Sequence, residues 1–156
     1  MNKDLILSRS WTTRARRSGE SGGSYNFVSR EEFEKAISED QFYEWAEFLG
    51  NLYGTPKPSP DMDRDLLLEI DIQGAEQVRA KDPSAVVILV VAPSTEEQRK
   101  RMLSRGDDPE SVVQRVLVGT DEIERAKKFA NYLVVNDDLD RAVGEISSII
   151  NSLRSN

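Results

Sequence analysis

The feature that most restricts the fold is an unbroken apolar run at residues 86–91, Val-Val-Ile-Leu-Val-Val. A run of this length, rich in β-branched side chains, is typical of a strand buried on both faces of a sheet. A second apolar run follows at residues 132–135, and helical patterns separate the two. Alternation of strands and helices indicates an α/β domain around a parallel sheet.

The remaining pattern predicts short strands and helices along the whole chain. Capping boxes, with a hydroxyl at the N-cap and a carboxylate three residues on, begin helices at Ser29 and Ser94. Residues 42–52 alternate in polarity and predict a hairpin, with Gly50-Asn51 as its turn. Further strands are expected at 5–7, 25–28 and 66–68, and helices at about 30–39, 73–80, 94–105, 109–128 and from 138 onward.

Composition limits the chemistry. The 156 residues predict one domain with a sizeable core. The net charge of −7 argues against a nucleic-acid or membrane-surface partner, because both need positive charge on the protein. With neither cysteine nor histidine, the chain lacks His-based catalytic triads and the usual zinc ligands, and we expect no metal site. The missing cysteines and the lack of a long apolar stretch near Met1 predict a cytoplasmic protein.

Positive charge gathers in one glycine-rich stretch, residues 10–25. Arg14 and Arg17 follow the hydroxyl of Ser10 and precede the phenol of Tyr25. A guanidinium binds phosphate oxygens bidentately, and hydroxyl groups complete their hydrogen-bond shell. The stretch is therefore either a clamp for a phosphomonoester or a solvated basic turn.

Several further motifs, in order, give the chain a family resemblance. They are Ser-x-Thr-Thr-Arg-x-x-Arg (10–17), Tyr-x-Phe-Val-Ser (25–29), Glu-Trp-Ala-Glu (44–47), Gly-Asn-x-Tyr-Gly-Thr (50–55), Leu-Glu-Ile-Asp-Ile-Gln-Gly (68–74) and Val-Val-Asn-Asp-Asp-Leu-Asp (134–140). In this order and spacing the chain resembles guanylate kinases from end to end. The resemblance implies a single domain over residues 1–156, in which helices flank a P-loop-kinase-like parallel sheet. It also implies a strand-rich GMP-binding insertion at about 24–55 and a lid-like region at about 101–120.

The resemblance also implies roles for individual residues. Those expected to hold the GMP phosphate are Arg14, Arg17, Tyr25 and Tyr53. Those expected to contact guanine are Glu44 as acceptor, Asp71 beside it, and the hydroxyls of Ser10 and Thr55 at O6. Arg105 and Arg115 would be catalytic residues of the lid. Without the resemblance, Glu44 would be an exposed strand residue, the tyrosines sheet-face aromatics and Arg115 a solvent-facing helix residue.

The family reaction converts ATP and GMP to ADP and GDP with Mg²⁺, so GMP and ATP are the implied partners. The family's P-loop motif, G-x-x-x-x-G-K-[ST], does not occur in these residues, and we expect its strand, loop and helix to be absent. Activity of these residues alone should then be absent or severely impaired. The sheet would lose an interior strand between residues 66–70 and 86–91, which predicts poor folding, rearrangement or self-association through unpaired edges. The alternatives are a non-catalytic module that binds GMP or phosphopeptides, and a decayed gene product.

Overall fold

The computed structural model describes residues 5–59 and 63–155, which form two compact units divided after Ser84. The first unit contains, in chain order, β1 (Leu5–Leu7), β2 (Trp11–Thr12), β3 (Asn26–Phe27), α1 (Arg30–Ser38), β4 (Phe42–Phe48), β5 (Asn51–Pro56), β6 (Asp65–Leu67) and α2 (Ile72–Lys81). The second contains β7 (Ile88–Val91), α3 (Thr95–Ser104), α4 (Pro109–Ala126), β8 (Tyr132–Val135) and α5 (Leu139–Arg154). None of these helices is both long and apolar enough to cross a membrane.

A four-stranded sheet with the order β3-β2-β5-β4 organises the first unit. β2 and β3 are parallel, whereas β5 is antiparallel to both β2 and β4. The core on one face consists of Phe33 and Phe42, whose rings stack at 4.4 Å, with Trp11 edge-on to Phe42 at 5.6 Å. A Cβ on Gly54 would lie 2.9 Å from both phenylalanine rings, so this packing requires glycine in β5.

The hairpin of β4 and β5 confirms the predicted alternation, but its turn lies one residue earlier than predicted. Leu49 and Gly50 occupy the turn with φ of 50° and 77°. A two-residue hairpin turn with positive φ at both positions matches the twist of the strands. The predicted Gly50-Asn51 was wrong because Asn51 already pairs with Phe48.

The two capping boxes differ. At α1, the Ser29 hydroxyl accepts from the Glu32 amide and the Glu32 carboxylate accepts from the Ser29 amide, so this box is complete. At α3, the Ser94 hydroxyl accepts from the Glu97 amide, but the Glu97 carboxylate accepts from Arg101 Nε instead. The second box is therefore only half formed.

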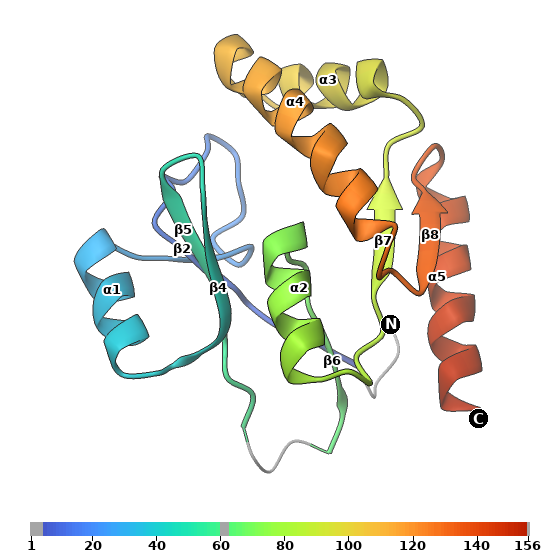
Figure 1. Ribbon diagram of the computed structural model, residues 1–156. Coiled ribbons are helices and arrows are strands. Elements are labelled where there is room, and N and C mark those ends of the chain that lie inside the picture. Colours follow the sequence, from blue (N-terminus) through green and yellow to red (C-terminus); the bar gives the residue numbers. More distant parts are fainter. Residues whose placement is uncertain (1–4, 60–62, 156) are drawn as a thin grey trace. The chain divides into compact units, whose positions relative to one another are not determined.

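The expected parallel pairing is present in two separate two-stranded sheets. β1 is parallel to β6 in the first unit, and β7 is parallel to β8 in the second. α4 contacts β7 and α5 contacts β8 (Figure 1). The expectation that residues 86–91 are buried on both faces was wrong, since Val86 and Val90 are 43% and 47% exposed. In the part of the chain that the structure describes, β7 pairs with β8 alone, which leaves one edge of β7 without a neighbouring strand.

Candidate nucleotide site

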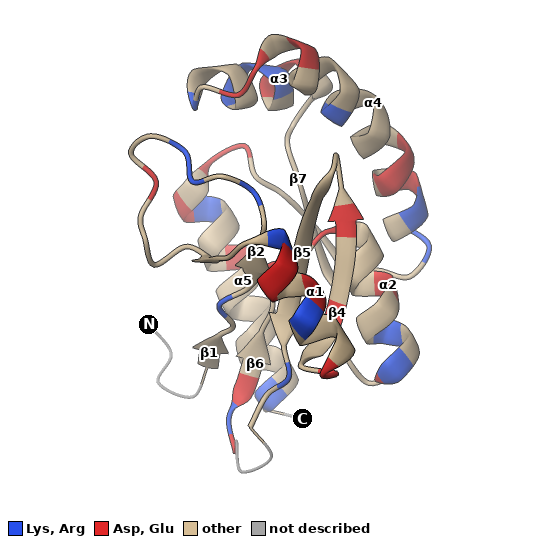
Figure 2. Cartoon of the chain, turned by 90° about the vertical axis from the view of Figure 1, so that its left-hand side faces the viewer, with Lys and Arg blue, Asp and Glu red and all other residues tan. Residues whose placement is uncertain are grey.

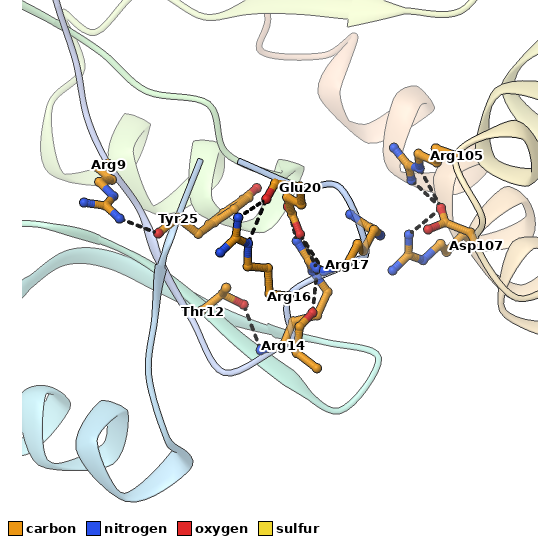
Figure 3. A network of polar contacts seen from close by, with 11 residues as sticks. Arg9, Thr12, Arg14, Arg16, Arg17, Glu20, Tyr25, Arg105 and Asp107 are labelled. Atoms are coloured by element: carbon orange, nitrogen blue, oxygen red, sulfur yellow. Dashed lines mark hydrogen bonds and ion pairs between the residues drawn. The ribbon is translucent and has the colours of Figure 1, made fainter. Parts of the chain in front are cut away.

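The loop between β2 and β3 is held together by one carboxylate. Glu20 accepts two hydrogen bonds from the Arg14 guanidinium, at 3.0 Å from Nη1 and 2.7 Å from Nη2, and a third from the Arg17 amide at 2.9 Å (Figure 3). Both side chains are largely buried. In Figure 2 the loop carries both blue and red segments. The Arg14 guanidinium is therefore not solvated as in a free basic turn, although Arg16 and several of its neighbours in this stretch are exposed.

The pairing changes the titration of both groups. Hydrogen bonds from Arg14, and then from the Arg17 amide, lower the pKa of Glu20 to about 2 from its ordinary value of 4.5, although burial opposes the shift. The same contact raises the pKa of Arg14. Glu20 is therefore an ionised carboxylate at neutral pH, bound by the Arg14 guanidinium and the Arg17 amide.

Two further arginines hold the loop through main-chain oxygens. Arg9 Nη2 donates to the carbonyl oxygens of Gly22 at 2.6 Å and Tyr25 at 2.9 Å. Arg16 donates to the carbonyl oxygen of Glu20. The sequence interpretation missed Arg9, Arg16 and Glu20. An acidic residue within a basic loop was the one signal that could have indicated Glu20.

Three of the four predicted phosphate ligands lie together. The Tyr25 and Tyr53 rings are 6.2 Å apart, and Arg14 Cζ lies 5.7 Å from the centroid of the Tyr25 ring. Burial, reinforced by Tyr53, raises the pKa of Tyr25, so its phenol stays a hydrogen-bond donor at neutral pH. Arg17 contributes its main-chain amide to the same loop.

A buried polar pair lies further along β5. Glu44 on β4 is paired in register with Thr55 on β5, and the two residues are 4% and 0% exposed. Glu44 is therefore not the exposed strand residue that its local sequence suggests. The Thr55 hydroxyl has no hydrogen-bond partner among the described residues. Ser10, just before β2, is also buried.

The environment of Glu44 makes its ionisation less favourable than in water. Burial raises the pKa of Glu44, and the Asp71 carboxylate adds to the rise. The hydroxyl and amide of Thr55 lie close enough to offset part of it, although the hydroxyl is not within hydrogen-bonding geometry. A buried carboxylate gains from a ligand that offers it hydrogen-bond donors, because an unsatisfied buried acceptor is costly. This is the kind of acceptor that the predicted role of Glu44 requires.

Asp71 has a structural role that the sequence interpretation missed. It is the N-cap of α2, and its Oδ1 accepts from the Gly74 amide at 2.8 Å. The signal was present, since aspartate is a strongly preferred N-cap. Its charge still acts on Glu44, so the two carboxylates are electrostatically coupled.

In the second unit, the predicted lid arginines meet at Asp107. Arg105 Nη2 lies 2.6 Å from Asp107 Oδ2 (Figure 3). Arg115 Nη1 lies 3.2 Å from the same oxygen. The side chains of Arg115 and Asp107 are 16% and 5% exposed, so Arg115 does not face solvent. Arg105 and Asp107 lie in the connection between α3 and α4, and Arg115 lies in α4. Among the described residues, no group of three or more Asp and Glu could hold a metal ion.

Comparison with known proteins gives one consistent result. The family profile for guanylate kinase matches residues 2–153. A guanylate kinase from Caldanaerobacter subterraneus is 46% identical over 154 residues, which cover 95% of this chain and 74% of that protein. One from Rubrobacter xylanophilus is 47% identical over 151 residues, which cover 94% and 79%. The crystal structure of guanylate kinase from Anaplasma phagocytophilum matches with a TM-score of 0.78 at 34% identity, over 96% of this chain and 76% of that one.

Proposed function

The chain belongs to the guanylate kinase family, and we propose that its first unit binds GMP as the phosphoryl acceptor of the family reaction. The phosphate would bind at the cluster of Arg14, Arg17, Tyr25 and Tyr53. Guanine would bind at Glu44 and Thr55, with Ser10 and Asp71 beside them. Both parts of this site lie in the same compact unit.

One observation carries the proposal: β5 presents both ends of the site on one face. Tyr53 and Thr55 are two residues apart, and side chains at this spacing point to the same side of a strand. Glu44 lies opposite Thr55 in the ladder, and Thr12, whose hydroxyl accepts from the Arg14 amide at 3.1 Å, lies opposite Tyr53. The sheet thus connects the proposed phosphate-binding cluster to the buried carboxylate of Glu44.

The chemistry of this acceptor fits guanine. Guanine presents N1–H and N2–H₂ as adjacent donors, which one carboxylate can accept, and O6 as an acceptor for a hydroxyl such as that of Thr55. Adenine presents an unprotonated N1 and has no 2-amino group, so it would offer Glu44 no pair of donors. A site whose buried polar groups are left unpaired by an analogue rejects it strongly.

The proposal covers the acceptor side of the reaction. ATP with Mg²⁺ is the phosphoryl donor that the family uses. These 156 residues contain no G-x-x-x-x-G-K-[ST] segment, and the described residues contain no cluster of carboxylates that fits Mg²⁺. Arg105 and Arg115 are the residues we propose for the lid, where charge neutralisation would assist transfer. We propose that residues 1–156 belong to a single guanylate-kinase-like domain, because the family profile spans both units.

Calorimetry with GMP, AMP and a phosphoserine peptide tests the proposed ligand. We expect GMP to bind about ten- to a hundredfold more tightly than AMP, because only guanine satisfies Glu44. Equal affinity for the two nucleotides would contradict the proposed guanine site. Binding of the peptide in preference to GMP would instead support the non-catalytic module.

A further inference from the structure

Helix α2 fixes the main chain of β4 on both sides of Glu44. Gln77 forms a pair of hydrogen bonds with Trp45, donating to its carbonyl oxygen at 2.6 Å and accepting from its amide at 3.4 Å. Lys81 Nζ donates to the carbonyl oxygen of Tyr43 at 2.5 Å. The residues before and after Glu44 are therefore both anchored to one helix, although β4 is an edge strand of its sheet.

The Glu44 side chain lies against the same helix, at Gly74. A Cβ on Gly74 would be 2.5 Å from Glu44 Oε2, 3.1 Å from Glu44 Cδ and 3.2 Å from Ile70 Cβ. Gly74 has no positive φ, so its backbone conformation does not require glycine. Glycine inside a helix is less stable than alanine by about 1 kcal/mol. The backbone gives no reason for glycine at this position, but the carboxylate does.

The position also suits a carboxylate electrostatically. Gly74 is the third residue of α2, so Glu44 Oε2 lies beside the first turn, where the helix dipole favours negative charge. The Gly74 amide itself is occupied by Asp71. Contact with the helix therefore positions the Glu44 carboxylate without using its hydrogen-bonding capacity.

We propose that Gly74 is a positioning residue for guanine selectivity: its lack of a side chain lets the Glu44 carboxylate lie against the first turn of α2, where it is aimed at the base. This inference rests on the proposed function. A methyl group at position 74 displaces the carboxylate from this place, and it leaves the phosphate cluster around Arg14 and Tyr53 unchanged.

The test compares Gly74→Ala with Gly144→Ala, a glycine in α5 whose added Cβ would meet nothing within 4 Å. Calorimetry should show that Gly74→Ala weakens GMP binding about ten- to a hundredfold and leaves AMP binding within about twofold. Gly144→Ala should change neither. Retention of the wild-type GMP-to-AMP ratio in Gly74→Ala, or an equal loss for both nucleotides, would overturn the inference.

A double-mutant cycle separates positioning from a general structural effect. In the Glu44→Gln background, Gly74→Ala should change the GMP-to-AMP ratio no further, because the group that it displaces no longer discriminates. An additional loss of the ratio in that background would contradict the inference. The GMP-to-AMP affinity ratio of the wild type tests the proposed function separately. A wild type without a preference for GMP would contradict the proposed function before any variant is compared.

A second variant decides the matter if Gly74→Ala does not fold. Gln77→Ala removes the anchor at Trp45 and introduces no clash. It should lower GMP affinity about three- to tenfold, which is the effect of about one hydrogen bond on binding, and it should leave AMP binding unchanged. Unchanged GMP affinity in folded Gln77→Ala would show that α2 does not position Glu44.

Discussion

The polar groups at the two ends of the proposed site differ in their hydrogen-bond partners. At the phosphate end, the Arg14 guanidinium and the Arg17 amide already bind the carboxylate of Glu20. At the base end, Glu44 and Thr55 are buried, and the Thr55 hydroxyl has no partner among the described residues. The phosphate end is thus pre-organised by an internal anion, whereas the base end contains a buried hydroxyl that no described residue pairs with.

This difference separates affinity from selectivity. Every nucleoside monophosphate carries the same phosphate, so the Arg14 end can contribute affinity but no choice of base. In the proposed site, only the Glu44 end would meet the atoms that distinguish guanine from adenine. Variants at the two ends should therefore have different effects on GMP and AMP.

Arg14→Ala should have the largest effect. It removes the proposed phosphate contact and leaves Glu20 without its main partner, so GMP and AMP should both lose about 2–3 kcal/mol of binding free energy. Isothermal titration of both nucleotides measures this, with Arg154→Ala in the last turn of α5 as a control for lost positive charge. A loss confined to GMP would break the assignment of the two ends.

Glu44→Gln should act on GMP alone. Glutamine replaces one acceptor oxygen by a donor that faces the guanine amine, so the preference for GMP over AMP should shrink by about 1–3 kcal/mol. AMP affinity should stay near the wild-type value. An equal loss for both nucleotides in a folded variant would place Glu44 outside the base site.

The selectivity should also depend on pH. Burial raises the pKa of Glu44, and only the ionised form accepts both guanine donors. The GMP-to-AMP affinity ratio should therefore be highest above the raised pKa and should fall as pH falls through it. The ratio cancels the titration of the phosphate, which both nucleotides share. The free energy of unfolding of the nucleotide-free protein should depend on pH in the opposite direction. Because the folded pKa of Glu44 is raised, its contribution to stability is present at low pH and is lost as pH rises through that pKa. A ratio that is independent of pH in the wild type would contradict this role.

Glu20→Gln should have the smallest effect, and we expect that effect on the free energy of unfolding. The folded pKa of Glu20 is about 2, below its ordinary value of 4.5, so its stabilisation is fully present above 4.5 and is lost as pH falls through about 2. We expect the free energy of unfolding to fall by roughly 1 kcal/mol at neutral pH, a value that allows for solvent screening. Thermal unfolding of both proteins from neutral pH downward should show the difference narrowing below 4.5. A difference that grows on acidification would contradict the ion pair.

Local patterns in the sequence determined much of the secondary structure. The capping box at Ser29, the alternation in β4 and the hairpin after it depend on neighbouring residues, and the structure contains all three. The ordered motifs also indicated the family, which the comparisons confirm. Local chemistry was less informative at the turn, where the strand register placed Leu49 and Gly50.

Only the tertiary structure decided what surrounds the functional groups. The burial of Glu44 depends on its pairing with Thr55 and on a glycine thirty positions away, and no local pattern indicates either contact. The sequence alone suggests that Arg14 is a free guanidinium, whereas in the structure it is paired with Glu20. Hydrogen bonds between near neighbours follow from spacing along the chain. Burial, and with it the pKa of a carboxylate, depends on which distant elements pack around it.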